Sequence, residues 1–218
     1  MIRKRIDQLR KKFINLKIDG YIVPKNDEFF SEYSKKDRLK FISNFSGSAG
    51  YAIILKKKNY LFVDSRYTIQ AELESKDQFK IIELENIVNC KLFKDITIGF
   101  DPKLFTSKQI SNFFLKFNKV KKIDINLIDI LMKQNSFISK PFFSLSKNIV
   151  GQSHLDKIKK VSNFLKKNNS DYLFVSAPEN VAWILNIRGF DNPNSPIPNC
   201  RLLINNKNRF FLIAEKKK

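Results

Sequence analysis

Residue types on which many catalytic sites depend are scarce in this chain of 218 residues. It has a single histidine, His154, and two cysteines, Cys90 and Cys200, which stand far apart. Zinc and redox sites need such residues at close spacing, so this content excludes most of them. An HExxH pair, a nucleophile elbow and a phosphate-binding P-loop are also missing. We therefore expect no catalytic residue and no metal ligand here, and we expect free thiols in a reducing cytoplasm.

Long apolar runs are missing as well. No run approaches the ~20 residues that span a bilayer, and residues 2–6 lack the apolar core and cleavage site of a signal peptide. We therefore expect a cytoplasmic protein without a membrane partner. Phenylalanine, by contrast, is abundant, and 21 of them in a chain that is 43% hydrophobic can fill the core of a large domain.

Basic residues outnumber acidic ones by 41 to 21, which gives a formal net charge of +20. Such a balance indicates either a nucleic-acid or membrane partner or a solvated, lysine-rich surface. Only 8 of the basic residues are arginine, the better reader of phosphate and guanine, and the lysines are scattered in short clusters. We therefore favour a solvated surface with no nucleic-acid partner, and keep nucleic-acid binding as the weaker alternative.

The first part of the chain alternates helical and strand patterns. Apolar residues at helical spacing predict helices over residues 2–16, over 67–75, from Ser107 as the capping residue, and over 128–132. Short apolar strands are predicted over residues 21–23, 51–55, 60–63, 79–84, 96–100 and 120–125. A polar loop over residues 56–59 makes a hairpin of two of them. This alternation with one hairpin is typical of an α/β fold with a mixed sheet flanked by helices.

The pattern then starts again. A second amphipathic helix over residues 155–165 precedes three segments that repeat the first half: 171–175 repeats 19–23, 182–189 stands where 40–47 stood, and 201–213 repeats the hairpin. An offset of about 150 residues indicates a domain duplication. We predict a first domain over 1–140, a linker over 141–152 and a truncated second domain over 153–218. Its incomplete sheet leaves an unpaired edge and an apolar face.

The segment Asp64-Ser-Arg-Tyr67 follows a predicted strand and opens a predicted helix. Asp64 can cap that helix, and Arg66 lies at the carboxyl end of the strand, where open α/β sheets commonly bind ligands. A guanidinium at that place can hold a carboxylate or a carbonyl. An internal ion pair between Arg66 and Asp64 explains the same residues, so both interpretations stay open.

The other candidate residues favour structural interpretations. Gly47-Ser-Ala-Gly50 lacks a phosphate-binding pattern, so it predicts a tight turn with close backbone packing. We expect Trp183 in the core and His154 at the surface or as a helix cap, and residues 188–191 form a binding loop or a connector. One charged loop is expected to be solvated, with local salt bridges among Asp27, Glu28, Glu32, Asp37 and Arg38.

Several of these segments resemble the N-terminal domains of the three-domain cytosolic Xaa-Pro aminopeptidases (aminopeptidase P). The first-domain motifs are Asp19-Gly-Tyr-Ile-Val-Pro24, Ser31-Glu-Tyr33, Arg38, Phe41-Ile-Ser-Asn-Phe-Ser-Gly-Ser-Ala-Gly50 and Asp64-Ser-Arg-Tyr67. The second-domain motif runs from Glu179 to Asp191, and together the motifs cover essentially the whole chain. Ser65 and Phe190 depart from the family pattern, which has Gly and Ser at these places.

The resemblance implies two creatinase-type α/β domains, the second incomplete, ahead of a catalytic domain that holds two divalent metals, typically manganese. It implies a peptide substrate with proline at the second position, a homo-oligomer, and a noncatalytic role for this region in substrate-site closure and assembly. It also implies that Arg66 contacts bound substrate, while none of the family's metal ligands can be placed on this sequence. The alternative is a stand-alone creatinase-fold module that acts in binding or as a scaffold.

Overall fold

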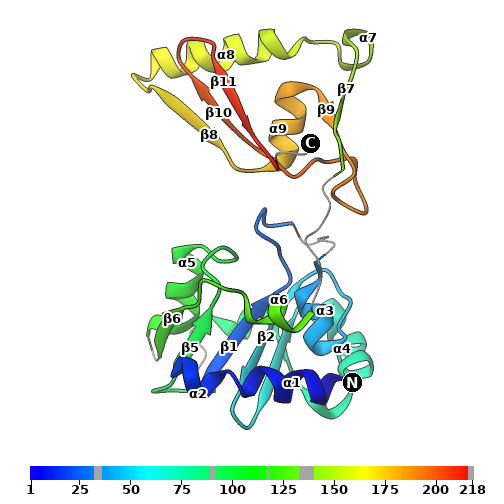
Figure 1. The fold of residues 1–218 in the computed structure, drawn as a ribbon, viewed down its shortest axis with the longest axis vertical. Coiled ribbons are helices and arrows are strands. Elements are labelled where there is room, and N and C mark those ends of the chain that lie inside the picture. Colours follow the sequence, from blue (N-terminus) through cyan, green and yellow to red (C-terminus); the bar gives the residue numbers. More distant parts are fainter. Residues whose placement is uncertain (32–35, 89–91, 117, 133–139, 216–218) are drawn as a thin grey trace. The chain divides into compact units, whose positions relative to one another are not determined.

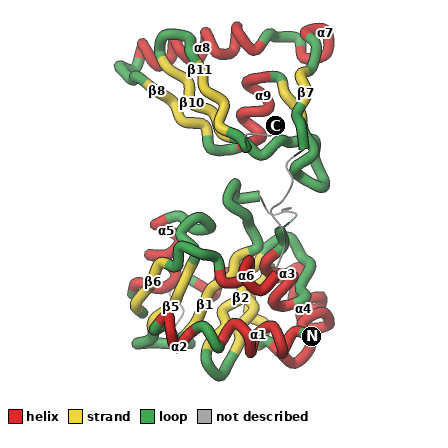
Figure 2. The backbone as a smooth tube through the Cα atoms, in the orientation of Figure 1, coloured by secondary structure: helices red, strands yellow, loops and turns green. Residues whose placement is uncertain are grey.

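The computed structural model describes residues 1–31, 36–88, 92–116, 118–132 and 140–215, which form two compact units (Figures 1 and 2). The described residues up to 132 belong to the first unit, and those from 140 onward belong to the second.

In the described part of the first unit, the strands form one mixed sheet in the order β4-β3-β2-β1-β5-β6. They are β1 (Gly20–Pro24), β2 (Gly50–Leu55), β3 (Asn59–Val63), β4 (Lys80–Glu83), β5 (Thr97–Phe100) and β6 (Lys119–Lys122). β2 runs antiparallel to both of its neighbours, and the remaining strand pairs are parallel. All strands except β2 therefore end at the same edge, which is called the carboxyl edge below. The predicted α/β fold with a mixed sheet is confirmed.

Helices flank this sheet. They are α1 (Ile2–Arg10), α2 (Phe13–Leu16), α3 (Arg38–Ser43), α4 (Thr68–Ser75), α5 (Ser107–Ile110) and α6 (Leu127–Met132), with 3-10 turns η1 (Ser65–Tyr67), η2 (Lys76–Gln78) and η3 (Leu84–Ile87) and the π-helical turn η4 (Ser111–Leu115). The single helix predicted over residues 2–16 is in fact two helices. Thr106, and not the predicted Ser107, caps α5, because its side chain forms a reciprocal capping box with Gln109.

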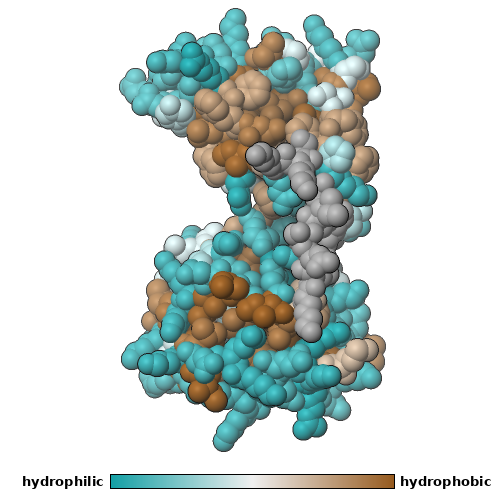
Figure 3. Space-filling view, viewed as in Figure 1, coloured by the Kyte–Doolittle hydropathy of each residue, from teal (hydrophilic) through white to brown (hydrophobic). Residues whose placement is uncertain are grey.

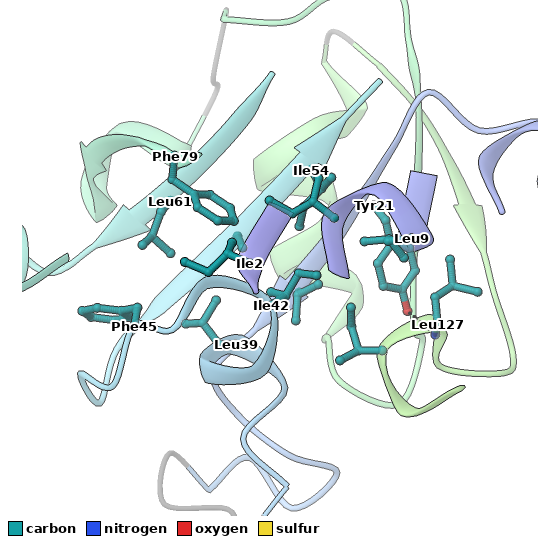
Figure 4. Packing of buried hydrophobic residues seen from close by; sticks show 14 of the residues in the cluster. Ile2, Leu9, Tyr21, Leu39, Ile42, Phe45, Ile54, Leu61, Phe79 and Leu127 are labelled. Carbon is teal, nitrogen blue, oxygen red and sulfur yellow. Dashed lines mark hydrogen bonds between the residues drawn. The ribbon is translucent and has the colours of Figure 1, made fainter. Parts of the chain in front are cut away.

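Two apolar clusters hold the sheet between its helical layers. One face packs against α1, α3 and α6, and Figure 4 shows Tyr21, Ile54 and Leu61 from three strands meeting Leu9, Leu39 and Leu127 from those helices. The other face lies under α5, η4 and the segment around η3. Strands that are buried on both faces read as continuous apolar runs, which explains the pattern Tyr21-Ile-Val23.

The second unit repeats the first hairpin. Its elements are α7 (Lys147–Val150), α8 (His154–Lys167), α9 (Pro178–Leu185), β7 (Phe143–Ser144), β8 (Tyr172–Val175), β9 (Ile187–Arg188), β10 (Arg201–Asn205) and β11 (Phe210–Ile213). In its described residues β11-β10-β8 form an antiparallel sheet, as β3-β2-β1 do in the first unit, and β7 pairs with β9. The predicted duplication is thus visible in the strand order. Residues 141–152, the predicted linker, hold β7 and α7.

Candidate functional site

Polar residues follow three strands of the first sheet at its carboxyl edge, among them Asp27, Asp64 and Arg66 from the sequence analysis. The segment Lys25 to Asp27 follows β1, Asp64 to Arg66 follows β3, and Asp101 follows β5. Ligands bind at this edge in open α/β sheets because several loops converge there. We therefore take it as the candidate site.

The Asp64–Arg66 corner has the geometry of a capped turn. The Asp64 carboxylate accepts the backbone N–H of Arg66 at 3.1 Å, so it caps η1 as predicted. The guanidinium of Arg66 donates from Nε at 2.8 Å and from Nη2 at 3.2 Å to the two oxygens of the same carboxylate. These side-chain and backbone hydrogen bonds hold the pKa of Asp64 below its ordinary value.

Arg66 nevertheless reaches solvent, since 73% of its side chain is exposed. Its guanidinium carbon lies 5.6 Å from the ring centre of Tyr67, and the Tyr67 hydroxyl lies 3.1 Å from Ser48 Oγ. The corner is therefore tied to the small-residue turn that precedes β2. The ion pair with Asp64 and the exposure of Arg66 occur together, so neither sequence interpretation of Arg66 excludes the other.

An open hollow of about 550 Å³ lies beside this corner. Its lining residues are Tyr51, Asp64, Ser65, Glu83, Leu84, Glu85, Ile87, Val88 and Phe113. Its carboxylates are Asp64 after β3, Glu83 at the end of β4 and Glu85 in η3. Asp64 and Ser65 of the corner line the hollow, whereas Arg66 is not among the lining residues. An exposed arginine next to these residues can donate hydrogen bonds to a carbonyl oxygen.

The turn before β2 is structural. A Cβ atom added to Gly47 would lie 2.3 Å from the ring of Phe45, and one added to Gly50 would lie 2.7 Å from the carbonyl oxygen of Phe62. Both glycines therefore serve close packing, which confirms the structural interpretation of this turn. Ser46 ties the turn to α4, because its amide and hydroxyl donate to Glu74 at 2.7 and 2.6 Å.

A buried charge cluster lies near the same edge, where the sequence predicted solvated residues. Arg38 is 1% exposed and donates from Nε to Asp129 Oδ1 at 2.7 Å and from Nη2 to Asp129 Oδ2 at 3.0 Å. Its Nη2 also donates to Glu28. The salt bridge between Arg38 and Glu28 confirms the predicted local pairing, and Asp37 pairs with Lys25, which the prediction did not name. Full solvation is wrong for Arg38 and for Asp27, which is 5% exposed.

Electrostatics explains how these charges stay ionised. Burial opposes the charge of Arg38, yet Asp129 and Glu28 outweigh it and raise the pKa of Arg38. Burial alone would raise the pKa of Asp129 as well, but hydrogen bonds and charge from Arg38 and Lys36 hold it below its ordinary value. Burial does raise the pKa of Asp27, although the amides of Ser31 and Phe29 donate to its carboxylate. Glu32 lies outside the described residues.

The remaining candidates lie in the second unit. Ser153, and not His154, caps α8, and the ring of His154 meets the edge of Phe210. The prediction of Trp183 in the core is wrong, because this residue is 60% exposed and is not part of the apolar cluster of the second unit. Asp191 is buried, and its carboxylate accepts hydrogen bonds from the backbone amides of Lys140 and Asn199. These bonds tie the loop over residues 188–191 to two other segments of the second unit.

Two observations on the described residues bear on metals and membranes. They contain no group of three or more His, Cys, Asp or Glu side chains that could hold a metal ion. In the same part of the chain, no helix is both long enough and apolar enough to cross a bilayer. Cys200 is buried, and Cys90 lies outside the described residues.

Comparisons with known proteins identify the family to which the chain is similar. Two family profiles described as Creatinase/Prolidase N-terminal domain match residues 5–130 and 133–218. The chain is 32% identical over 210 residues to a probable Xaa-Pro aminopeptidase P of Laccaria bicolor, covering 89% of this chain and 33% of that protein. It is 30% identical over 220 residues to Xaa-Pro aminopeptidase 1 of Dictyostelium discoideum, covering 90% of this chain and 35% of that protein. It thus spans about a third of the length of these relatives.

A solved structure of similar fold supports the same family assignment. The structure of an X-prolyl aminopeptidase from Caenorhabditis elegans, described as a cytosolic enzyme with a di-nuclear active site, covers the whole chain with a TM-score of 0.88 at 25% identity. The chain covers 39% of that structure. This chain therefore belongs to the creatinase/prolidase N-terminal domain family and matches the N-terminal third of Xaa-Pro aminopeptidases.

Proposed function

We propose that this chain is the noncatalytic N-terminal region of a proline-specific metallo-aminopeptidase, which removes the residue before a proline at the second position of a peptide. The similarity to Xaa-Pro aminopeptidases over 89–90% of this chain carries the proposal. The two divalent metals, with manganese as the expected ion, are proposed to be held by residues outside this region. The intact enzyme is proposed to be a cytoplasmic homo-oligomer, to which this region contributes substrate-site closure and assembly.

Within this role we assign substrate contact to Arg66. Its guanidinium follows β3 at the carboxyl edge, 73% exposed and oriented by both oxygens of Asp64, whose carboxylate lines the hollow. A preoriented guanidinium loses little conformational entropy when it binds a carbonyl or carboxylate of a peptide. Ser65 stands where the family pattern has Gly, and Asp64, Arg66 and Tyr67 of the motif are retained.

The noncatalytic claim is tested on the chain itself. Purified protein is incubated with a peptide that carries proline at the second position, with manganese and with a chelator as control. We expect no hydrolysis in either case. Metal-dependent turnover by the isolated chain would overturn the claim.

The role of Arg66 is tested in a chimaera, in which this chain replaces the matching part of the C. elegans enzyme. Arg66→Ala should lower kcat/KM about ten- to a hundredfold, since a hydrogen bond to a charged group is worth about 1.5–3 kcal/mol. The kcat/KM of the Arg66→Lys chimaera should lie between those of the unsubstituted and the Arg66→Ala chimaeras. Lys57→Ala is the matched control, because Lys57 is an exposed cation in the β2–β3 loop at the opposite edge. An unchanged kcat/KM in Arg66→Ala removes this residue from the site.

A further inference from the structure

An open hollow of about 600 Å³ lies at the amino edge of the first sheet, where all of its strands except β2 begin. It is formed by α1, the β2–β3 loop (residues 56–58) and the start of β4, and Figure 3 shows hydrophilic side chains over α1 and this loop at the bottom of the view. The lining contains two carboxylates, Asp7 and Asp77, and five cations, so its net charge is +3. The cations come from all three elements and are Arg3, Arg10, Lys57, Lys58 and Lys80.

The guanidinium of Arg10 is held in place by the elements around the hollow. Its Nε donates to the carbonyl oxygen of Leu55 at 2.8 Å, and its Nη2 donates to Asn59 Oδ1 at 2.9 Å. Asn59 Nδ2 in turn donates to the carbonyl oxygen of Gln78 at 2.8 Å, so α1, β3 and η2 are joined. Burial lowers the pKa of Arg10, and the charge of Asp7, 3.7 Å away, offsets only part of this effect. Arg10 is therefore a fixed cation whose charge is incompletely compensated.

The other cations surround this fixed charge. The backbone of Lys58 is held in the hairpin turn, because its carbonyl oxygen accepts the Leu55 N–H at 2.8 Å. Arg3, Lys58 and Lys80 are exposed, and none of them forms an ion pair with a carboxylate of the described residues. Like charges that a rigid frame holds around one hollow repel each other and focus a positive potential into it. An anion that enters the hollow relieves this repulsion.

The lining also indicates the kind of anion. Lysine binds phosphate as a point charge, and arginine donates to two phosphate oxygens at once. A phosphate group carries a charge of about −1.5 to −2 at pH 7, so a molecule with several such groups balances the lining, whereas a single carboxylate does not. The aromatic residues of the lining, Tyr60 and Phe79, are only 6% and 7% exposed and offer no surface on which a base could stack. The hollow therefore favours a small polyphosphate over a nucleic acid.

We propose that this hollow binds a small molecule with several phosphate groups, which Arg3, Lys58 and Lys80 hold around the fixed guanidinium of Arg10. The site lies at the edge of the sheet opposite to the Asp64–Arg66 corner. The proposal concerns binding alone, and it rests neither on the role proposed for Arg66 nor on peptide hydrolysis.

The probe is inorganic tripolyphosphate, titrated into the 218-residue chain at low salt and followed by NMR of the backbone amides. We expect saturable shifts at residues 56–59 and 77–80, and added salt should weaken the binding. The double variant Lys58→Gln/Lys80→Gln should weaken it about tenfold, because two surface ion pairs with the probe are lost. Lys160→Gln/Lys167→Gln is the matched control, since it removes the same charge at exposed positions on α8 and should leave the affinity unchanged.

Circular dichroism checks that each variant folds, which is expected because all four substituted side chains are exposed. Equal weakening in the two double variants would overturn the proposal, because the net charge of the chain, and not the hollow, would then attract the probe. Absence of shifts at these amides at about 1 mM probe would overturn it as well. A short single-stranded RNA and an oligoglutamate peptide, each matched in charge to the probe, are titrated in parallel. If either binds more tightly than tripolyphosphate and loses this affinity in Lys58→Gln/Lys80→Gln, the occupant is a nucleic acid or an acidic peptide and the proposal of a small polyphosphate is refuted.

Discussion

The buried charge cluster around Arg38 predicts a large loss of stability on a nearly isosteric substitution. Asp129→Asn keeps the size of the side chain and removes the negative charge that Arg38 Nε and Nη2 contact at 2.7 and 3.0 Å. The guanidinium, which is 1% exposed, then has Glu28 as its remaining carboxylate, and that group is 36% exposed. A buried cation that loses its nearest counter-charge keeps its desolvation cost without compensation.

The magnitude follows from burial. Removal of one partner from a buried ion pair costs roughly 3–5 kcal/mol. We expect the lower end, about 3 kcal/mol, because Asp129 is 28% exposed and Glu28 remains in place. With a urea m-value of about 2–3 kcal/mol/M, the unfolding midpoint should fall by about 1–1.5 M.

Urea unfolding of the wild type and of Asp129→Asn, monitored by circular dichroism, measures this shift in the unfolding midpoint. Asp7→Asn is the matched control, because Asp7 is 55% exposed and lies 3.7 Å from Arg10. An exposed pair contributes at most about 1 kcal/mol, so its midpoint should hardly move. Equal shifts in the two variants would refute the reasoning from burial.

The same cluster contributes to the pH dependence of stability. Although burial opposes it, the hydrogen bonds and charges of Arg38 and Lys36 keep the pKa of Asp129 below its ordinary value. A carboxyl with a depressed folded pKa contributes stability that is fully present above its unfolded pKa of about 4 and is lost as pH falls through the folded pKa. The difference between wild type and Asp129→Asn should therefore shrink below about pH 4. A constant difference from pH 7 down to pH 3 would contradict this.

Further substitutions test three local features, each by urea unfolding. Thr106→Ala should cost about 1 kcal/mol because it breaks the capping box of α5, while Ser107→Ala should cost less than about 0.5 kcal/mol. Gly47→Ala should cost about 1–3 kcal/mol because the new methyl meets the ring of Phe45, and Phe45→Leu in the same chain should recover part of it. Burial raises the pKa of Asp27, so its charge is costly at neutral pH; Asp27→Asn should be neutral or stabilising at pH 7 and should lose that advantage below about pH 4.

Local patterns in the sequence predicted most of the fold because the relevant forces act over short stretches. Tyr51–Leu55 and Tyr60–Val63 are apolar runs around a polar loop, so hairpin formation follows from near neighbours. Asp64 caps η1 by accepting the backbone N–H of Arg66, two residues further along the chain, so this interaction is equally local. The corner that carries Arg66 was predictable for the same reason.

The buried cluster was not predictable, because its partners are distant in sequence. Arg38 and Asp129 are separated by 91 residues, and a pattern of charges in one loop carries no sign of that pairing. The prediction that Trp183 is buried was wrong for a related reason. Lys157, 26 residues away, bonds to the Trp183 carbonyl at 2.7 Å and places its ammonium 4.1 Å from the ring centre, which holds the indole at the surface.

The two copies also show which features belong to the repeated frame. Hairpin register and the apolar character of both sheet faces recur at equivalent positions, because every copy of this sheet must bury at least one face. The acidic residue after the third strand recurs as well. Tyr51 pairs with Phe62 as Arg201 pairs with Ile213, so Glu215 stands in the second copy where Asp64 stands in the first. The position that corresponds to Arg66 lies outside the described residues. The repeated frame therefore includes the hairpin and the carboxylate that follows it, which agrees with the role of Asp64 as the cap of η1.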